Sequence, residues 1–434
     1  MKKKKCLFTA LVLLLVLIVP FWANGSKDDT SVSGSDKDRG VTTIVYWQYF
    51  LDTKVALMKK LITEFEARNP DIKVIQETVP YDNYNVKVAA TVPTGKGPNI
   101  VCLFYGWLPQ YIKAGYLQPL PESAFSPARV EAEFFPMVTA SKFDGKYYAI
   151  PTAVRGLSLI YNKDLFEKAG MDVSKPPKTL DEYVKMAQAL TITDAKGNIV
   201  QAGGDLQVNG QIHSWWREVL IRQFGGAPYS DDGKKVTYDC QAGYDAMRFL
   251  TDLQTKYKIG FDSFMDTNDT AFINNALAMT IEGSFRLAKF NNTKGLNYYV
   301  AELPERNGIK SNAASYWANG ITKFTTGKEF EASVRFLQFL TSEYAMERWL
   351  AEVGELPAKT AVASKPELLS DPKIGPFLKG LSYAHATKFV DEMGQRQVVI
   401  DAFNKIVLDG MTPEKAVHEA AVEEQKILDK YYKK

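Results

Sequence analysis

Two tryptophans in this sequence each follow an apolar, β-forming run and stand near a side chain that can hydrogen-bond. Trp47 is followed directly by Gln48, and Tyr105 comes two positions before Trp107. An indole ring offers a flat apolar face, while amide and phenol groups donate and accept hydrogen bonds. Ligands of open α/β sheets collect at strand ends, so these four residues are candidate contacts for a ring that carries hydroxyl groups. Core packing is the alternative for both indoles, because aromatic side chains are readily buried.

A second aromatic pair, Trp215 and Trp216, opens an expected helix beside His213. Neighbouring residues on a helix point about 100° apart, so one of the two rings should pack inward. The other ring and His213 would then be free to contact a ligand. The spacing alone leaves open which ring that is.

Glu282 and Ser284 lie where an expected strand gives way to a helix. The start of a helix leaves backbone N–H groups unpaired, and such groups attract polar ligands. We expect Glu282 to accept hydrogen bonds from ligand hydroxyls, with Ser284 beside it.

Signatures of enzymes and metal sites are incomplete in this sequence. His418 and Glu419 begin like the helix of a zinc protease, but Val422 stands where the second histidine is needed. There is no Gly-x-Ser-x-Gly elbow, and the glycines at 95 and 97 lack the phosphate-loop pattern. We therefore predict no catalytic residue, no cofactor and no metal site. An exported glycoside hydrolase stays open as an alternative, since two carboxylates across a sugar cleft suffice for hydrolysis.

The N-terminus has the pattern of an export signal. Four lysines at 2–5 precede an apolar run at 11–19, and small residues at Ala23 and Gly25 allow cleavage. We predict a signal peptide at 1–25, cut after Gly25 with Ala23 as the second choice, followed by a disordered leader at 26–40 that is rich in Ser, Asp and Gly. A retained membrane anchor is the alternative. Cys6 precedes the apolar run, so a lipoprotein is not expected.

The charge balance of the exported protein is close to neutral. Removing the four lysines of the signal leaves 49 basic against 50 acidic side chains. This composition lacks the dense basic stripe that binds phosphate backbones, so nucleic acid is not an expected partner. The remaining cysteines, Cys102 and Cys240, stand in different contexts, and we expect both to be unpaired although export would permit a disulfide.

From Val41 onward, short β-rich runs alternate with amphipathic helical segments, which is typical of an α/β protein. Strands are expected at 42–47, 72–79 and 100–104, with helical crossovers between them. The last hundred residues are mostly helical in pattern.

Several phrases together resemble the extracellular sugar-binding proteins of ABC importers, of the maltodextrin-binding type. The first three are FDGKYYAIP at 143–151, IYNKDLFEKAG at 160–170 and PPKTLDEY at 176–183. Further matches follow the same order: AGYLQPL at 114–120, AMTIEGSF at 278–285, LP at 303–304, FLQFLTS at 336–342 and GELP at 354–357. The resemblance spans nearly all of the chain that would remain after export.

This resemblance implies an α/β, two-lobed periplasmic-binding-protein fold with a multi-crossing hinge and a helical C-terminal region. The first lobe would comprise 41–152 and 304–341, and the second 153–303 and 342–434, with crossings at Val154-Arg155 and Leu303-Pro304. The family closes on its ligand by hinge motion. The implied role is a monomeric, periplasmic or extracellular substrate-binding component that delivers a mono- or oligosaccharide to a membrane permease. A ligand-sensing protein for a polyol or a sugar phosphate is a further alternative.

The resemblance also adds candidate ligand contacts. Arg155 lies in the implied hinge, where related proteins place a polar contact, although a surface salt bridge is the alternative. Trp317, Asn319 and Glu355 complete the implied lining of the cleft. Phe285 stands where the family commonly has a tryptophan, and 312–316 lacks a usual glycine pair, so the identity of the sugar is left open.

Overall fold

The computed structural model describes residues 40–206 and 211–433. The chain divides into two units, Met1–Val41 and Thr42–Lys434, and the fold described below is that of the second unit. The predicted signal peptide and nearly all of the predicted leader lie outside the described residues. Across the described part of the chain, no helix has the length and apolar character needed to cross a membrane.

The largest sheet has the strand order β10-β6-β11-β3-β1-β2. At one end β1 (Thr42–Tyr49) pairs in parallel with β2 (Ile72–Val79) and β3 (Ile100–Phe104), and these are the three strands that the sequence predicted. Strand β11 (Asn312–Ile321) runs antiparallel to β3 and then to β6 (Ala149–Asn162). We call the elements around β1–β3 the first lobe.

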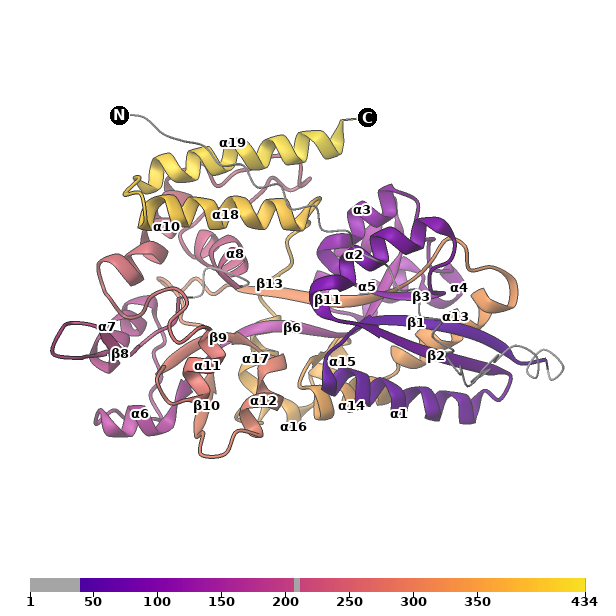
Figure 1. The fold of residues 1–434 in the computed structure, drawn as a ribbon, viewed down its shortest axis with the longest axis horizontal. Coiled ribbons are helices and arrows are strands. Elements are labelled where there is room, and N and C mark those ends of the chain that lie inside the picture. Colours follow the sequence, from indigo (N-terminus) through magenta and orange to yellow (C-terminus); the bar gives the residue numbers. More distant parts are fainter. Residues whose placement is uncertain (1–39, 207–210, 434) are drawn as a thin grey trace, which may run out of the picture. The chain divides into compact units, whose positions relative to one another are not determined.

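Strand β6 belongs to two parts of this sheet. Its residues Ala149–Gly156 pair with β11, whereas Leu157–Asn162 pair with β9 (Met279–Gly283) and β10 (Tyr298–Ala301). We call the elements around β9 and β10 the second lobe. The change of partners occurs between Gly156 and Leu157, so the strand itself forms one crossing between the lobes (Figure 1).

The side chain of Asn312 secures the point where β6 changes partners. Its Oδ1 accepts from the backbone N–H of Leu157 at 3.1 Å, and its Nδ2 donates to the Leu157 carbonyl at 2.8 Å. Asn312 is fully buried, so both bonds are shielded from water. In the segment where the related proteins often have glycines, this chain therefore has an amide that replaces part of the strand ladder.

Helices cover the sheet in both lobes (Figure 1). The first lobe carries α1 (Asp52–Arg68), α2 (Tyr81–Thr91), α3 (Leu108–Lys113) and α13 (Gly327–Leu340), and the second carries α7 (Leu180–Leu190), α10 (Gln241–Thr255), α18 (Glu392–Val407) and α19 (Pro413–Tyr432). The other helices are α4 (Glu122–Phe125), α5 (Pro127–Glu133), α6 (Lys163–Lys168), α8 (Gln211–Ser214), α9 (Ile221–Gln223), α11 (Asn268–Ile273), α12 (Leu287–Asn291), α14 (Glu343–Val353), α15 (Thr360–Ala363), α16 (Pro366–Leu369) and α17 (Gly375–Leu381). The short strands are β4 (Lys142–Phe143), β5 (Lys146–Tyr147), β7 (Ile192–Thr193), β8 (Ile199–Gln201), β12 (Leu356–Pro357) and β13 (Ala384–His385).

The sequence predicted the return crossing at Leu303-Pro304, and the contacts of this loop favour a later one. The carbonyl of Pro304 accepts from Gln223 Nε2 at 2.9 Å, and Glu305 bridges to Thr179, so this loop is still held by second-lobe residues. We therefore propose that β11 carries the chain back to the first lobe.

Contacts of helix α14 favour a later lobe boundary than the one predicted at residue 342. Helix α14 packs on α1 of the first lobe, with Arg348 Nη1 at 2.9 Å from Glu64 and Lys60 Nζ at 2.7 Å from Glu352. We propose that the chain re-enters the second lobe only after α15.

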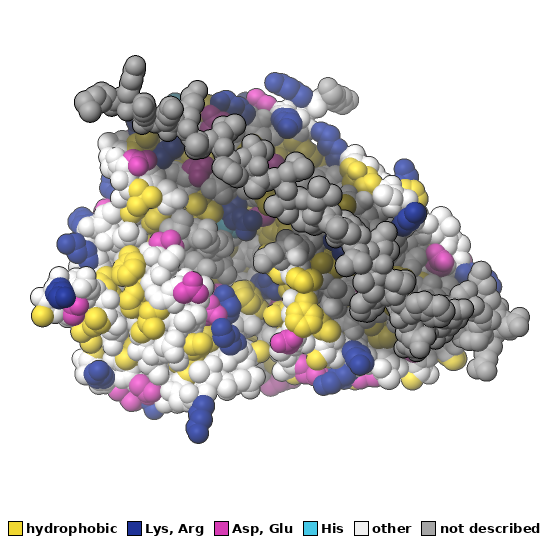
Figure 2. Space-filling model, viewed as in Figure 1, with side chains coloured by type: hydrophobic (Ala, Val, Ile, Leu, Met, Phe, Trp, Pro, Cys, Tyr) yellow, Lys and Arg dark blue, Asp and Glu magenta, His cyan; other side chains and the backbone are white. Residues whose placement is uncertain are grey.

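Charged side chains of both signs are scattered over the visible face of the protein (Figure 2). Cys102 is buried, Cys240 is partly buried, and both are free, as the sequence suggested.

The two C-terminal helices are joined to the second lobe by a buried ion pair. Arg217 Nη1 lies 2.8 Å from Glu424 Oε1, and neither side chain is exposed to solvent. Tyr238 donates to Glu424 Oε2 at 2.6 Å, and Gln395 Nε2 donates to its other oxygen at 3.0 Å. This arrangement connects α18, α19 and the helical turn after α8 through one carboxylate.

We predict that Glu424→Gln destabilises the protein by about 3–5 kcal/mol, because the substitution leaves the Arg217 charge buried and uncompensated. Glu423→Gln is the matched control, since Glu423 pairs with Lys426 at the surface, where such pairs contribute little. Urea unfolding at neutral pH measures both. Equal free energies of unfolding for the two variants would refute the role given to Glu424.

Candidate functional site

Four aromatic side chains of the first lobe, Tyr49, Tyr81, Trp107 and Trp317, form one contiguous group that we call the aromatic wall. Trp317 lies at its centre, with ring centroids at 4.1 Å from Tyr49, 5.3 Å from Trp107 and 6.2 Å from Tyr81. The strands explain this meeting: Tyr49 ends β1, and Trp317 stands opposite Phe104, the last residue of β3. The carboxyl ends of neighbouring strands thus place the rings at one edge of the sheet.

Tyr81 is the most accessible member of the aromatic wall, with 53% of its surface exposed. Partial burial raises the pKa of its hydroxyl, while the charges of Arg396 and Arg155 oppose that effect and Glu392 reinforces it. Arg396 and Glu392 belong to α18 of the second lobe. The hydroxyl of Tyr81, in the first lobe, therefore lies where charges of the second lobe and of the hinge act together.

An ion cluster at the hinge connects the aromatic wall to β6. Strand β12 pairs with β6 so that Leu356 stands opposite Val154, which brings Glu355 next to Arg155. Glu355 forms ion pairs with Arg155 and, at 2.9 Å, with Lys54. Trp349 Nε1 donates to the same carboxylate at 2.8 Å, and Arg155 Nη2 donates to the Tyr49 hydroxyl at 3.0 Å.

This cluster fixes the charge of Glu355. Burial alone would raise the pKa of the carboxyl, but Arg155 and Lys54 outweigh burial and lower the pKa to about 2. Glu355 is therefore ionised at neutral pH and its oxygens are occupied by protein donors. Its role in this geometry is to position Arg155.

Second-lobe residues extend the site beyond Arg155. The Arg155 guanidinium lies 4.5 Å from the ring centroid of Phe285, which follows Ser284 at the end of β9. Glu282 is almost completely buried, accepts from the Gly283 N–H at 3.2 Å and lies 3.6 Å from Arg286 Nε. Burial raises the pKa of Glu282, and Arg286 opposes the shift.

His213 and Glu392 face Trp107 from the second lobe. His213 Nε2 lies 3.8 Å from Glu392 Oε1. Burial lowers the pKa of His213 well below its usual range, with Arg217 and Arg396 contributing, so the imidazole is neutral at pH 7. Burial raises the pKa of Glu392, while the Arg396 charge opposes that shift, and the Glu392 side chain packs against Gly106, next to Trp107.

The contacts just described form one continuous path across the lobes. It runs from His213 through Glu392 to Trp107, then through Trp317, Tyr49 and Arg155 to Phe285 and its neighbours Ser284 and Glu282. Six of the predicted ligand contacts lie on this path: Trp107, Arg155, His213, Glu282, Ser284 and Trp317. We call this set the inter-lobe site.

Several buried polar atoms on or near the path have no hydrogen-bond partner among the described residues. They are Trp47 Nε1, Gln48 Nε2, Trp107 Nε1, His213 Nδ1 and Ser284 Oγ. An unsatisfied buried polar group costs about 1–3 kcal/mol. A ligand with several hydroxyl groups can supply partners for the atoms on the path itself, which are Trp107 Nε1, His213 Nδ1 and Ser284 Oγ.

The other predicted contacts lie away from the path. Trp216 is fully buried against Tyr238 in the second-lobe core, which leaves Trp215 as the member of the pair with some exposed surface. The Trp47 ring is covered by Lys87 of α2, whose Nζ lies 4.4 Å from the ring centroid. Tyr105 stacks on Tyr316.

Gln48, Asn319 and Glu355 line a small cavity behind the aromatic wall. Its volume is about 10 Å³, so it is large enough for one water molecule at most. Asn319 Oδ1 accepts there from the Tyr46 hydroxyl at 3.0 Å. In this conformation these side chains support the wall from behind.

Sequence reasoning missed Tyr49, Tyr81, Arg286, Glu392 and Arg396. Tyr49 could have been found, because residues two apart on a strand share a face and Trp47 was already a candidate. Tyr81, directly after Pro80 at the start of α2, and Glu392, directly after the N-cap residue Asp391 of α18, carry only the signal of a helix start. Nothing local shows that these two helix starts face each other.

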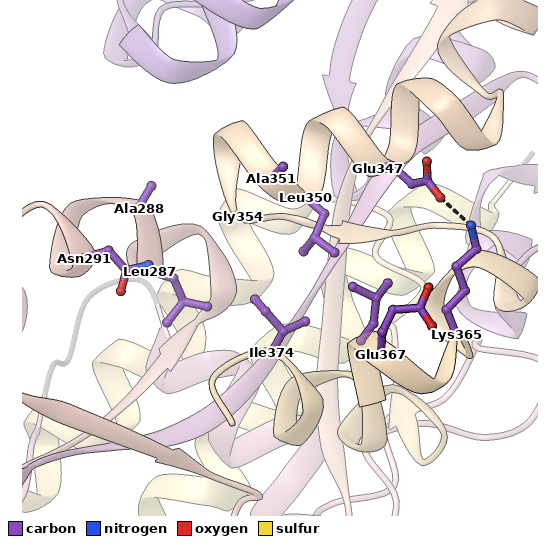
Figure 3. A pocket seen from close by; sticks show the side chains of 11 residues that line it. Leu287, Ala288, Asn291, Glu347, Leu350, Ala351, Gly354, Lys365, Glu367 and Ile374 are labelled. Atoms are coloured by element: carbon purple, nitrogen blue, oxygen red, sulfur yellow. Dashed lines mark hydrogen bonds and ion pairs between the residues drawn. The ribbon is translucent and has the colours of Figure 1, made fainter. Parts of the chain in front are cut away.

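An apolar cavity of about 390 Å³ lies between α12, α14 and α16 (Figure 3). Leu287, Leu350 and Ile374 point into it, and the Glu347–Lys365 ion pair stands at its edge. None of the predicted ligand contacts lines this cavity, so we do not assign the site there.

Comparison with known proteins gives one family. The family described as bacterial extracellular solute-binding protein matches residues 60–376. A maltotriose-binding protein of Pyrococcus abyssi is 24% identical over 364 residues, covering 82% of this chain and 75% of that protein. The sn-glycerol-3-phosphate-binding periplasmic protein of Shigella dysenteriae is 24% identical over 441 residues, covering 91% of this chain and 94% of that protein.

Solved structures share the fold. An ABC transporter solute-binding protein of Thermotoga lettingae, bound with α-D-tagatose, has a TM-score of 0.76 at 25% identity and covers 89% of this chain and 100% of that protein. A cyclic α-maltosyl-1,6-maltose-binding protein of Arthrobacter globiformis has a TM-score of 0.78 at 18% identity, with 90% and 100% covered. The architecture is thus the two-lobed one that the sequence predicted.

We predict that Glu355→Gln lowers the free energy of unfolding by about 3 kcal/mol at pH 7, because it leaves Lys54 and Arg155 without their counter-charge. The native carboxylate has its pKa lowered from an ordinary 4.5 to about 2, so its contribution is complete above about pH 5 and is lost as the pH falls toward 2. The difference between native protein and variant should therefore shrink over that range in urea unfolding.

Glu352→Gln is the control variant. Glu352 lies on α14, close to Glu355 in sequence, but pairs with Lys60 and Arg348 near the protein surface. A difference between native protein and Glu355→Gln that stays constant from pH 5 to pH 2 would contradict the assigned ion cluster.

Proposed function

This chain belongs to the bacterial extracellular solute-binding protein family, and we propose that it is the substrate-binding component of an ABC importer for a neutral mono- or oligosaccharide. The inter-lobe site holds the sugar, and the permease of the importer receives it. The observation that carries the proposal is the path of aromatic rings and unpartnered polar atoms that runs from one lobe to the other.

The charges of the inter-lobe site favour an uncharged ligand. Arg155 is paired with Glu355, Arg286 lies 3.1 Å from Asp269, and Arg396 lies 3.5 Å from Glu392. His213 is neutral at pH 7 because burial lowers its pKa. With each of these arginines already compensated, a phosphate would bring an extra charge that lacks a free counter-charge among them. This favours a sugar over the sugar phosphate that the sequence left open.

The chemistry of the lining also suits a sugar. Trp107 and Trp317 meet nearly at right angles, so the two indoles present faces in two directions to a ring. Ser284, His213 and Trp107 supply hydroxyl, imidazole and indole groups that can bond to hydroxyls on either side. The relative named for maltotriose and the tagatose-bound neighbour support this class of ligand.

Export is part of the proposal. The family is extracellular, and the relative from Shigella dysenteriae is named as periplasmic. The lysines at 2–5 and the apolar run after them fit a signal peptide ending at Gly25, and we propose a monomer released by that cleavage.

A thermal-unfolding panel tests the ligand class. We expect maltotriose, D-tagatose or a related neutral sugar to raise the midpoint, since a ligand at a hundredfold excess over its dissociation constant stabilises by about 2.7 kcal/mol. sn-Glycerol 3-phosphate should leave it unchanged. If only the phosphate raises the midpoint, the neutral-sugar assignment is wrong. Recovery of the sugar unaltered after incubation distinguishes a binder from a glycoside hydrolase.

We expect Trp107→Ala to weaken binding of the sugar found in that panel by about 10- to 100-fold, because truncating a buried aromatic contact typically costs 2 kcal/mol or more. Phe324→Ala is the control, since Phe324 is half exposed and lies outside the inter-lobe site. Isothermal titration measures both. Unchanged affinity in Trp107→Ala would remove this residue from the site.

A further inference from the structure

The C-terminal end of α19, in the second lobe, reaches α3 of the first lobe. Lys113 Nζ donates to the backbone carbonyl of Tyr431, and the same ammonium lies 4.4 Å from the centroid of the Tyr431 ring. The Tyr431 hydroxyl donates to the Pro109 carbonyl at 3.4 Å. Three contacts of different kinds thus join one residue near the chain end to a single short helix.

The C-terminal end of α19 extends beyond the contacts that hold this helix in the second lobe. Helix α19 is held in the second lobe by Glu424, through Arg217 and Tyr238, and Leu428 is its last fully buried residue. Tyr431 lies about two turns past Glu424, where the helix no longer rests on the second-lobe core. In Figure 1 the end of α19 points away from the helices beneath it and toward the side of the molecule that holds α2 and α3.

The surroundings of Tyr431 are loosely filled. A cavity of about 210 Å³ lies beside it, with walls from both lobes that include Tyr105, Phe143 and Phe389. Close packing does not extend across the lobes at this point, where the Tyr431 contacts are accompanied by one ring contact, between Tyr105 and Phe389 at 6.0 Å. An attachment of this kind can break when the lobes separate, at the cost of a few weak interactions.

We propose that the end of α19 is a latch that holds the two lobes closed in the ligand-free protein. The contact between Tyr431 and Lys113 joins residues of opposite lobes, so it exists only while the lobes are together. A contact present in only one of two conformations shifts the population toward that conformation. Because apparent affinity scales with the fraction of binding-competent protein, the latch tunes ligand binding without touching the ligand.

None of the latch residues lies on the inter-lobe site path. Tyr431, Lys113 and Pro109 form no hydrogen bond, ion pair or ring contact with Arg155, His213 or Trp317 in the described part of the chain, and Lys113 is exposed. A variant of Lys113 therefore leaves the lining of the site intact. This separation lets the latch be tested independently of the ligand and of the proposed function.

The adjacent tyrosine is a matched control. Tyr432 lines the same cavity as Tyr431, but its ring lies 5.8 Å from Lys234 Nζ and its hydroxyl lies near Gly233, both in its own lobe. Replacing Tyr432 removes an aromatic side chain of the same type from the same helix end. It leaves the contacts to α3 in place.

Pulsed electron resonance between two spin labels measures the lobe separation directly. The labels go on Phe324→Cys in the first lobe and Val422→Cys on α19, which are both exposed, in a chain with Cys6 and Cys240 replaced by serine. Cys102 is buried and remains. In the ligand-free parent we expect a population at the short distance. Lys113→Met and Tyr431→Ala should each lower the closed-to-open ratio roughly three- to tenfold, and Tyr432→Ala should not.

The double variant Lys113→Met/Tyr431→Ala should lower the ratio further than either single variant but by less than the product of the two effects, because the variants share the cation–π contact and each also removes one bond of its own. Circular dichroism melting checks that every variant is folded, and Lys113→Met, at a surface position, keeps the test valid if Tyr431→Ala is unstable. The latch is refuted if the ligand-free parent shows only the long distance, if neither single variant changes the ratio, or if Tyr432→Ala changes it equally.

Discussion

The structure depends on one strand, β6, being shared between two lobes. Its fourteen residues pair with β11 over the first half and with β9 and β10 over the second half, and almost all of them are buried. A strand buried on both faces cannot slip in register without exposing apolar side chains, so the hinge has a fixed alignment. Asn312 reinforces that alignment by bonding to both backbone groups of Leu157, at the residue where the partners change.

The alignment of β6 decides the chemistry of the site. Because β12 adds to β6 at Val154, Glu355 is brought to Arg155, and the two are joined by Lys54 from α1. The guanidinium then bonds to Tyr49 of the first lobe and stacks on Phe285 of the second. A single cation, oriented by a buried carboxylate, thus contacts both walls of the inter-lobe site. Motion at the hinge would change the distance between Tyr49 and Phe285, so Arg155 is placed where ligand binding and lobe closure can influence each other.

Closure and ligand binding use separate parts of the molecule in this structure. The inter-lobe site is lined by strand ends and helix starts, where polar groups lack partners. The proposed latch uses the C-terminal end of α19, which is supported by the buried Arg217–Glu424 pair and bonds to α3. Such a division allows the strength of closure to vary without altering the groups that select the ligand.

Much of the fold follows from local patterns in the sequence. The alternation of β-rich and helical runs is enough to predict the three parallel strands of the first lobe, and the phrases at 143–183 and 278–285 predict the two-lobed family. The boundaries of the lobes were harder to predict from local sequence patterns. The sequence predicted a crossing between the lobes at Leu303-Pro304. We propose that Pro304 stays with the second lobe, because Gln223, which is distant in sequence, donates to its carbonyl. Helix α14 comes after the boundary predicted at residue 342 and was therefore expected in the second lobe. Ion pairs of Arg348 with Glu64 and of Glu352 with Lys60 instead attach α14 to α1.

By itself, the sequence determined the class of fold, the family, and residue types able to hold a sugar, because strand and helix periodicity and family phrases are local properties of the chain. It could not decide which indole of Trp215 and Trp216 turns inward. It also could not show that Glu355 forms ion pairs with Arg155 and Lys54, or that Tyr81 and Glu392 face one another. Those outcomes depend on burial and on charges brought together across more than a hundred residues. Only the tertiary structure sets such distances, and with them the pKa of each carboxyl and the partners of each ring.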